Sequence, residues 1–135
     1  MDQRWLRTTS LHTSALLAVL KKTGPAIVVC HSQGGEITFD AIAQAPELFD
    51  RIIALEPSGF PQDADTLGDT ELTLVAGDFL DTAPHWIHRA KGWSSLVANA
   101  ANVTLINSAS LTSGNSHMLM MDENSDILFK ELLGK

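Results

Sequence analysis

The chain has 135 residues, 44% of them apolar and 19% charged, so we expect one folded domain over residues 1–135. Its formal net charge is −7, which argues against a nucleic-acid partner because such binding depends on clustered Lys and Arg. The longest apolar runs are far shorter than the roughly 20 residues that cross a bilayer, so no membrane span is predicted.

The N-terminal stretch MDQRWLRTTS has neither the compact apolar run nor the small-residue cleavage site of a signal peptide. On this chain alone we therefore expect a cytoplasmic protein. The single cysteine, Cys30, excludes an internal disulfide.

Helical and extended patterns alternate along the chain. Leucines at helical spacing predict a first helix over Gln3–Lys22, which Gly24 and Pro25 end. The further expected elements are a strand at Ala26–Cys30, a helix at Gln33–Gln44, a strand at Arg51–Leu55, a loop at Pro57–Thr70, a strand at Glu71–Ala76, a helix at Pro84–Ala101, a strand at Val103–Asn107 and a helix at Ser125–Leu133. This alternation predicts an α/β fold with a parallel sheet of about four strands and flanking helices.

The first strand runs directly into the turn CHSQGG, with Ser32 at its centre. A serine becomes a nucleophile when a sharp turn between strand and helix exposes its Oγ, and small neighbours relieve the crowding there. Gly34 supplies a small residue two positions after the serine, and Gly35 adds room, whereas Cys30 replaces the usual first glycine. The backbone N–H of Gln33, at the start of the next helix, is the expected oxyanion donor.

A nucleophilic serine needs a histidine as its base, and His117 in the loop SGNSHM follows the last predicted strand. We expect a mobile imidazole there. His31 adjoins the serine but is predicted to point away, as a packing or substrate-side residue. His85 and His88 lie three residues apart on a predicted helix without a third ligand, so no metal site is expected, and His12 is predicted to be a surface residue.

Two carboxylates compete for the role of the acid that orients the histidine. Glu56 follows the second strand directly, and Pro57 biases it toward an extended backbone. Asp78 follows the third strand, the more usual position, but the usual G-x-x-D spacing would place the acid where Leu80 stands. We favour Glu56 and keep Asp78 as the alternative.

With CHSQGG, ALEPSG, LVAGDFLD and GNSHMLMMDENS, the chain resembles the C-terminal half of an α/β-hydrolase, and most specifically a group of bacterial esterases. The resemblance implies a Ser32, Glu56 and His117 triad acting on a small-molecule ester through an acyl-enzyme, without a cofactor. Phe60 and the Met118–Met121 run are candidates for an acyl pocket, or for ordinary packing.

A full hydrolase sheet has strands before the serine strand, together with the loop that gives the second oxyanion donor. Their absence leaves Ala26–Cys30 as a sheet edge, so we expect a homodimer or a partner segment to pair with it. The alternatives to an esterase are a weakly active or non-catalytic chain that serves as a binding or scaffold module, and a thiol enzyme that uses Cys30.

Overall fold

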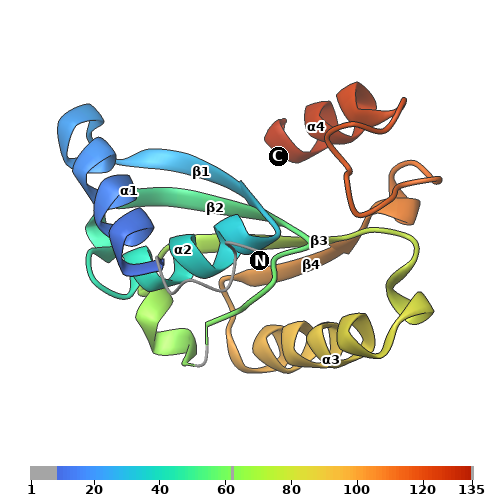
Figure 1. Cartoon of the computed structure of the whole chain (residues 1–135), viewed down its shortest axis with the longest axis horizontal. Coiled ribbons are helices and arrows are strands. Elements are labelled where there is room, and N and C mark those ends of the chain that lie inside the picture. The colour runs from blue at the N-terminus through green and yellow to red at the C-terminus, as the bar shows by residue number, and fades with distance from the viewer. Residues whose placement is uncertain (1–8, 62, 135) are drawn as a thin grey trace, which may run out of the picture.

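The computed structural model describes residues 9–61 and 63–134. Four strands form one sheet in the order β1-β2-β3-β4, and every neighbouring pair is parallel. The strands are β1 (Ala26–His31), β2 (Phe49–Leu55), β3 (Glu71–Ala76) and β4 (Val103–Asn107). The predicted α/β class with a four-stranded parallel sheet is therefore confirmed (Figure 1).

Among the described residues four α-helices flank the sheet, and each follows or precedes a strand as the alternating pattern predicts. They are α1 (Thr9–Thr23), α2 (Gln33–Ile42), α3 (Pro84–Asn99) and α4 (Ser125–Leu133). Within the described ranges, no helix is long and apolar enough to cross a membrane.

Alternate side chains of the strands point to two separate cores. Ile52, Ala54 and Leu74 face the larger core, which is shared with α1, α2 and α3. Ile53 and Val75 face a smaller core shared with α4. Because side chains in a strand alternate between faces, one apolar run such as RIIAL fills both cores.

Several predicted bounds were wrong by a few residues. The first helix is described from Thr9, and its predicted residues 3–8 lie outside the described part of the chain. β2 begins at Phe49 rather than Arg51, because Phe49 is buried and pairs with Ala26. The predicted loop at 57–70 contains the short 3-10 helix Ala64–Leu67, whose Leu67 is fully buried in the larger core.

The remaining differences are at element ends: β1 continues to His31, one residue beyond the predicted Cys30. The helix predicted to end at Gln44 ends at Ile42, and the one predicted to end at Ala101 ends at Asn99. Helix ends fray, so shifts of this size leave the topology unchanged.

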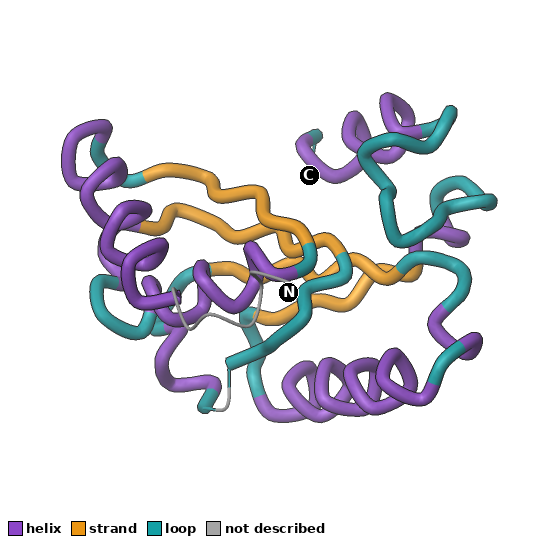
Figure 2. The backbone as a smooth tube through the Cα atoms, viewed as in Figure 1, coloured by secondary structure: helices purple, strands orange, loops and turns teal. Residues whose placement is uncertain are grey.

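The parallel arrangement puts the carboxyl ends of all four strands at one end of the sheet. The segments after these strands, shown as teal loops in Figure 2, carry the predicted serine, acid and histidine loop. Open α/β sheets bind their ligands in this place.

Candidate active site

Ser32 sits at the sharp turn between β1 and α2. Its backbone has φ +50° and ψ −121°, a conformation that costs a non-glycine residue about 1–3 kcal/mol. The backbone carbonyl of Ser32 accepts hydrogen bonds from the N–H of Gly35 at 3.0 Å and of Ser58 at 2.8 Å. The predicted strained turn is therefore present, and contacts from two segments hold it.

The glycine that this turn needs most is Gly35 rather than Gly34. A Cβ on Gly35 would overlap the Cβ of Pro57, whereas a Cβ on Gly34 would make only an ordinary 3.7 Å contact with Cys30. The reason is that the segment after β2 crosses closely over the first turn of α2. The motif spacing indicated Gly34 for this steric role, and nothing in the local sequence indicates the crossing.

Glu56 follows β2 and has the other positive φ among the non-glycine residues of the described chain, +38°. The expectation that Pro57 would keep Glu56 extended is therefore wrong. The N–H of Glu56 donates to the carbonyl of Val75 at 2.9 Å, which binds this residue to β3. Backbone strain concentrated at Ser32 and Glu56 is typical of a functional site, where surrounding contacts over-determine the conformation.

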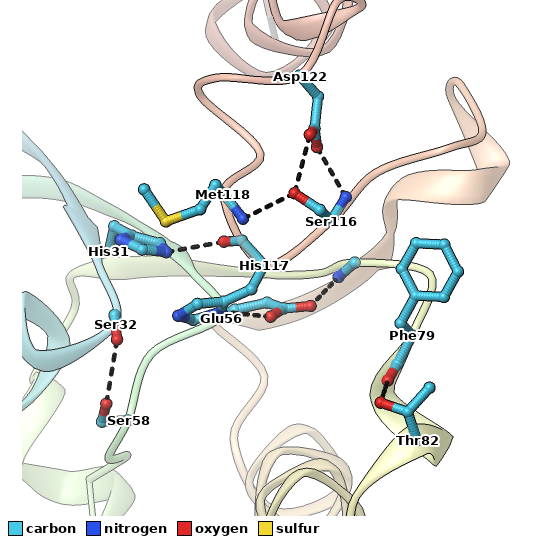
Figure 3. A network of polar contacts seen from close by, with 11 residues as sticks. His31, Ser32, Glu56, Ser58, Phe79, Thr82, Ser116, His117, Met118 and Asp122 are labelled. Carbon is cyan, nitrogen blue, oxygen red and sulfur yellow. Dashed lines mark hydrogen bonds and ion pairs between the residues drawn. The ribbon is translucent and has the colours of Figure 1, made fainter.

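The carboxylate of Glu56 is buried, with 3% of the residue exposed, and both of its oxygens have partners. Oε1 accepts the backbone N–H of Gly77 at 2.7 Å, and Oε2 lies 2.6 Å from Nδ1 of His117 (Figure 3). A Cβ on Gly77 would overlap Oε1, so only glycine fits there. A buried carboxylate needs such partners because an isolated buried charge is very costly.

His117 brings its ring between the other two groups. Its Nδ1–H donates to Glu56, which in the neutral ring leaves Nε2 as an acceptor, and in Figure 3 Nε2 lies on the side of the ring toward Ser32. The side chain is 35% exposed. Among the described residues the partner of Ser32 Oγ is Ser58 Oγ, at 3.4 Å, and not His117. Catalytic hydrogen bonds are often long or unformed before substrate binds.

The loop that carries His117 is held by hydrogen bonds to two aspartates, Asp78 and Asp122. Asp78 Oδ2 accepts the N–H groups of Gly114 at 2.6 Å and Asn115 at 3.2 Å. Asp122 accepts the N–H and the hydroxyl of Ser116 at 2.7 and 2.8 Å. Asp78 thus supports the loop, whereas Glu56 contacts the histidine ring.

The hydrogen bonds to Asp78 predict a pH-dependent stability. Burial alone would raise the pKa of Asp78, but hydrogen bonds from Gly114, Asn115 and Ser108 outweigh it and hold the pKa below its ordinary value. A depressed pKa means that the ionised form stabilises the fold. This contribution is present above the unfolded-state pKa, about 3.9, and is lost as the pH falls through the folded-state pKa.

We therefore expect Asp78→Asn to lower the free energy of unfolding by about 1 kcal/mol at pH 7, because solvent screens part of the interaction, and by clearly less at pH 3. Urea unfolding at the two pH values measures this. Asp40→Asn, at an exposed position on α2, is the control and should change stability little. An equal loss for Asp78→Asn at both pH values would contradict the role of the ionised carboxylate.

The other residues singled out from the sequence include a cysteine and two histidines. Cys30 is buried, and burial raises its pKa to about 11, so its thiol stays protonated and is a poor nucleophile. His85 contacts Trp86 at a ring-centroid distance of 5.3 Å. His12 is exposed on α1, as expected. In the described part of the chain no three His, Cys, Asp or Glu side chains are grouped as metal ligands.

The predicted oxyanion donor has a free N–H, whereas the acyl-pocket candidates differ in how far they are buried. The N–H of Gln33, in the first turn of α2, meets no acceptor within the described residues. Leu119 is fully buried in the smaller core and so serves packing, whereas Phe60 is partly buried and packs against Gly92 of α3. Met118 is 41% exposed.

Two aromatic residues lie against His117: His31, whose direction was predicted wrongly, and Trp86, which was not identified as a site residue. The ring of His31 lies 4.5 Å from that of His117, centroid to centroid, so His31 does not point away from the site. Trp86, near the start of α3, lies 4.7 Å from the same ring. Arg89 in turn lies over Trp86, with its Cζ 4.7 Å from the ring centroid. Only tertiary structure brings these residues together, and no local signal identifies them.

Among the solved structures that the chain resembles is one described as a novel bacterial esterase. The TM-score is 0.80 and the identity is 27%, and the match covers 90% of this chain but only 41% of the esterase. No protein-family model and no curated protein matches the sequence. The chain therefore has an esterase-like α/β hydrolase fold and spans about two fifths of that neighbour's length.

Proposed function

We propose that the protein is a serine hydrolase of carboxylic esters, with Ser32 as nucleophile, His117 as base and Glu56 as the acid that orients the histidine. The observation that carries the proposal is the Glu56 to His117 contact of 2.6 Å beside a serine held at φ +50°. The esterase-like fold supports the same reaction class.

The reaction follows from these groups. Nε2 of His117 takes the hydroxyl proton of Ser32 while Oγ forms a bond to the ester carbonyl carbon. The tetrahedral oxyanion accepts a hydrogen bond from the free N–H of Gln33. Collapse of the tetrahedral intermediate expels the alcohol, which takes the proton from His117. Water then attacks the acyl carbon while His117 takes its proton. Collapse of this second intermediate breaks the bond to Ser32 Oγ, which takes the proton from His117, and releases the carboxylic acid. Throughout, the carboxylate of Glu56 stabilises the protonated ring.

Hydrolysis of a short-chain aryl ester by the purified chain tests the proposal. The expected result is turnover with an initial burst of alcohol, because acylation precedes hydrolysis of the acyl-enzyme. A folded chain without turnover or burst would favour the alternative, a binding or scaffold module.

The outer edge of β1 offers a surface on which another strand could pair. In the described sheet β1 pairs only with β2, so one row of its backbone N–H and C=O groups faces outward. Ile27 and Val29, on the same face, are 54% and 44% exposed. Proteins usually block such edges with charges, proline or bulges. The strand AIVVCH carries no Lys, Arg, Asp or Glu, and only its beginning, at Pro25 and the irregular register of Ala26, is protected.

We propose that a second copy of the chain pairs with this edge through a two-fold axis. A two-fold interface uses the same patch on both copies, and an apolar strand without charges is self-complementary. Val29→Lys should convert a dimer into a monomer, because it places a charge on the strand that pairs with the second copy. Val19→Lys is the matched control, since Val19 on α1 is exposed to a similar extent, 55%.

Sedimentation measures the mass of the three proteins, and hydrogen exchange measures protection of the Val28 and Val29 amides. The expected result is a dimer with slow exchange for the wild type and for Val19→Lys. A wild-type monomer with freely exchanging Val28 and Val29 would contradict self-association.

A further inference from the structure

His31 is the last residue of β1 and directly precedes Ser32. Its Nε2 lies 2.8 Å from the backbone carbonyl oxygen of His117, 86 residues further along the chain (Figure 3). A carbonyl oxygen only accepts hydrogen bonds, so Nε2 of His31 carries the proton and donates. This hydrogen bond joins the residue next to the nucleophile to the backbone of the residue that carries the base.

Other contacts fix the histidine loop on the N-terminal side of His117. Asp78 binds the backbone of residues 114 and 115, and Asp122 binds that of residue 116. At His117 itself, the backbone carbonyl accepts a hydrogen bond from the His31 side chain. His31 thus holds the loop at the histidine itself, where a small rotation would move the ring relative to Ser32.

The two imidazole rings also contact each other. Their centroids are 4.5 Å apart and their planes are tilted by 43°. The hydrogen bond fixes the backbone position of His117, and the ring contact restricts its side-chain torsions. Both effects favour one placement of Nε2 between Glu56 and Ser32, and placement to within about 1 Å is worth up to about 100-fold in rate.

We propose that His31 is a positioning residue, which holds His117 in its reactive placement by donating a hydrogen bond to the His117 carbonyl. The proposal rests on the esterase function proposed above. It gives a function to a histidine that does not itself touch the reacting atoms.

Two variants separate the hydrogen bond from the ring contact. His31→Phe keeps an aromatic ring but removes the donor, whereas His31→Gln removes the ring and keeps a side-chain N–H at a similar reach. We expect His31→Phe to lower kcat by about 10- to 100-fold with KM changed less than about twofold, because ground-state binding is intact. His31→Gln should restore most of kcat.

A second measurement is independent of activity. The proton that Nδ1 of His117 donates to Glu56 at 2.6 Å should give a downfield proton resonance in the free protein. We expect this resonance to broaden or disappear in His31→Phe and to persist in His31→Gln, with circular dichroism and the unfolding midpoint confirming that both variants are folded.

The outcomes are distinct. Unchanged kcat and an unchanged resonance in His31→Phe would overturn the proposal, and so would equal losses in both variants, which would assign the effect to the ring instead. If the wild type hydrolyses no ester, the function proposal fails, and the resonance alone still decides whether His31 positions His117.

Discussion

Replacing Ser32 by alanine should reduce ester hydrolysis by at least about 10⁴-fold, the largest effect that we expect from any single substitution. The reason is that no bond to the acyl group can form without Oγ, while the fold loses only one small polar atom. The rate of aryl ester hydrolysis, with the uncatalysed rate subtracted, measures the change.

Ser58→Ala is the matched control, because Ser58 Oγ lies only 3.4 Å from Ser32 Oγ and its loss is the same chemical change. We expect Ser58→Ala to keep activity within about tenfold, since removal of one neutral hydrogen bond is worth only about 1 kcal/mol. If Ser58→Ala abolished hydrolysis and Ser32→Ala did not, the nucleophile would be assigned wrongly.

Glu56→Gln is expected to lower kcat by about 10⁴-fold, the second largest effect, and to leave KM nearly unchanged. The amide has one oxygen for two donors, Gly77 N–H and His117 Nδ1–H. Its NH₂ group facing His117 would favour the other tautomer of the ring, with the proton on Nε2, and that tautomer cannot accept a proton from Ser32. Steady-state kinetics across a range of ester concentrations separates kcat from KM.

Asp78→Asn is the comparison variant, since it also turns a carboxylate after a strand into an amide. It should lose stability but keep most of its kcat when assayed well below its unfolding temperature. If Asp78→Asn removed turnover and Glu56→Gln did not, Asp78 would be the acid and our assignment would be wrong.

The sequence predicts the sheet well because parallel strands in a two-sided core are short, nearly continuous apolar runs. It also places Ser32 and Glu56 after strands, and parallel pairing then puts both at one end of the sheet. The assignment of Glu56 in place of Asp78 depended on the spacing to Leu80 and on a resemblance. In the structure Asp78 accepts the N–H groups of the histidine loop, which supports the proposed choice of Glu56.

What the sequence does not predict is how segments distant in the chain approach each other. The overlap that makes glycine necessary at residue 77 comes from the side chain of Glu56, 21 residues earlier. The hydrogen bond from His31 crosses 86 residues, and β propensity gives no information about where that ring turns. Such contacts depend on the packing of loops, which periodicity does not encode.

The measurement that tests the central claim most directly is mass-spectrometric mapping of a fluorophosphonate label on the folded wild-type chain. The account predicts a single label on the peptide that contains Ser32, and a much slower reaction for Glu56→Gln, because the probe reacts only with a serine activated by its histidine. A folded chain that takes no label, or one labelled at Ser58 or elsewhere, would contradict the account.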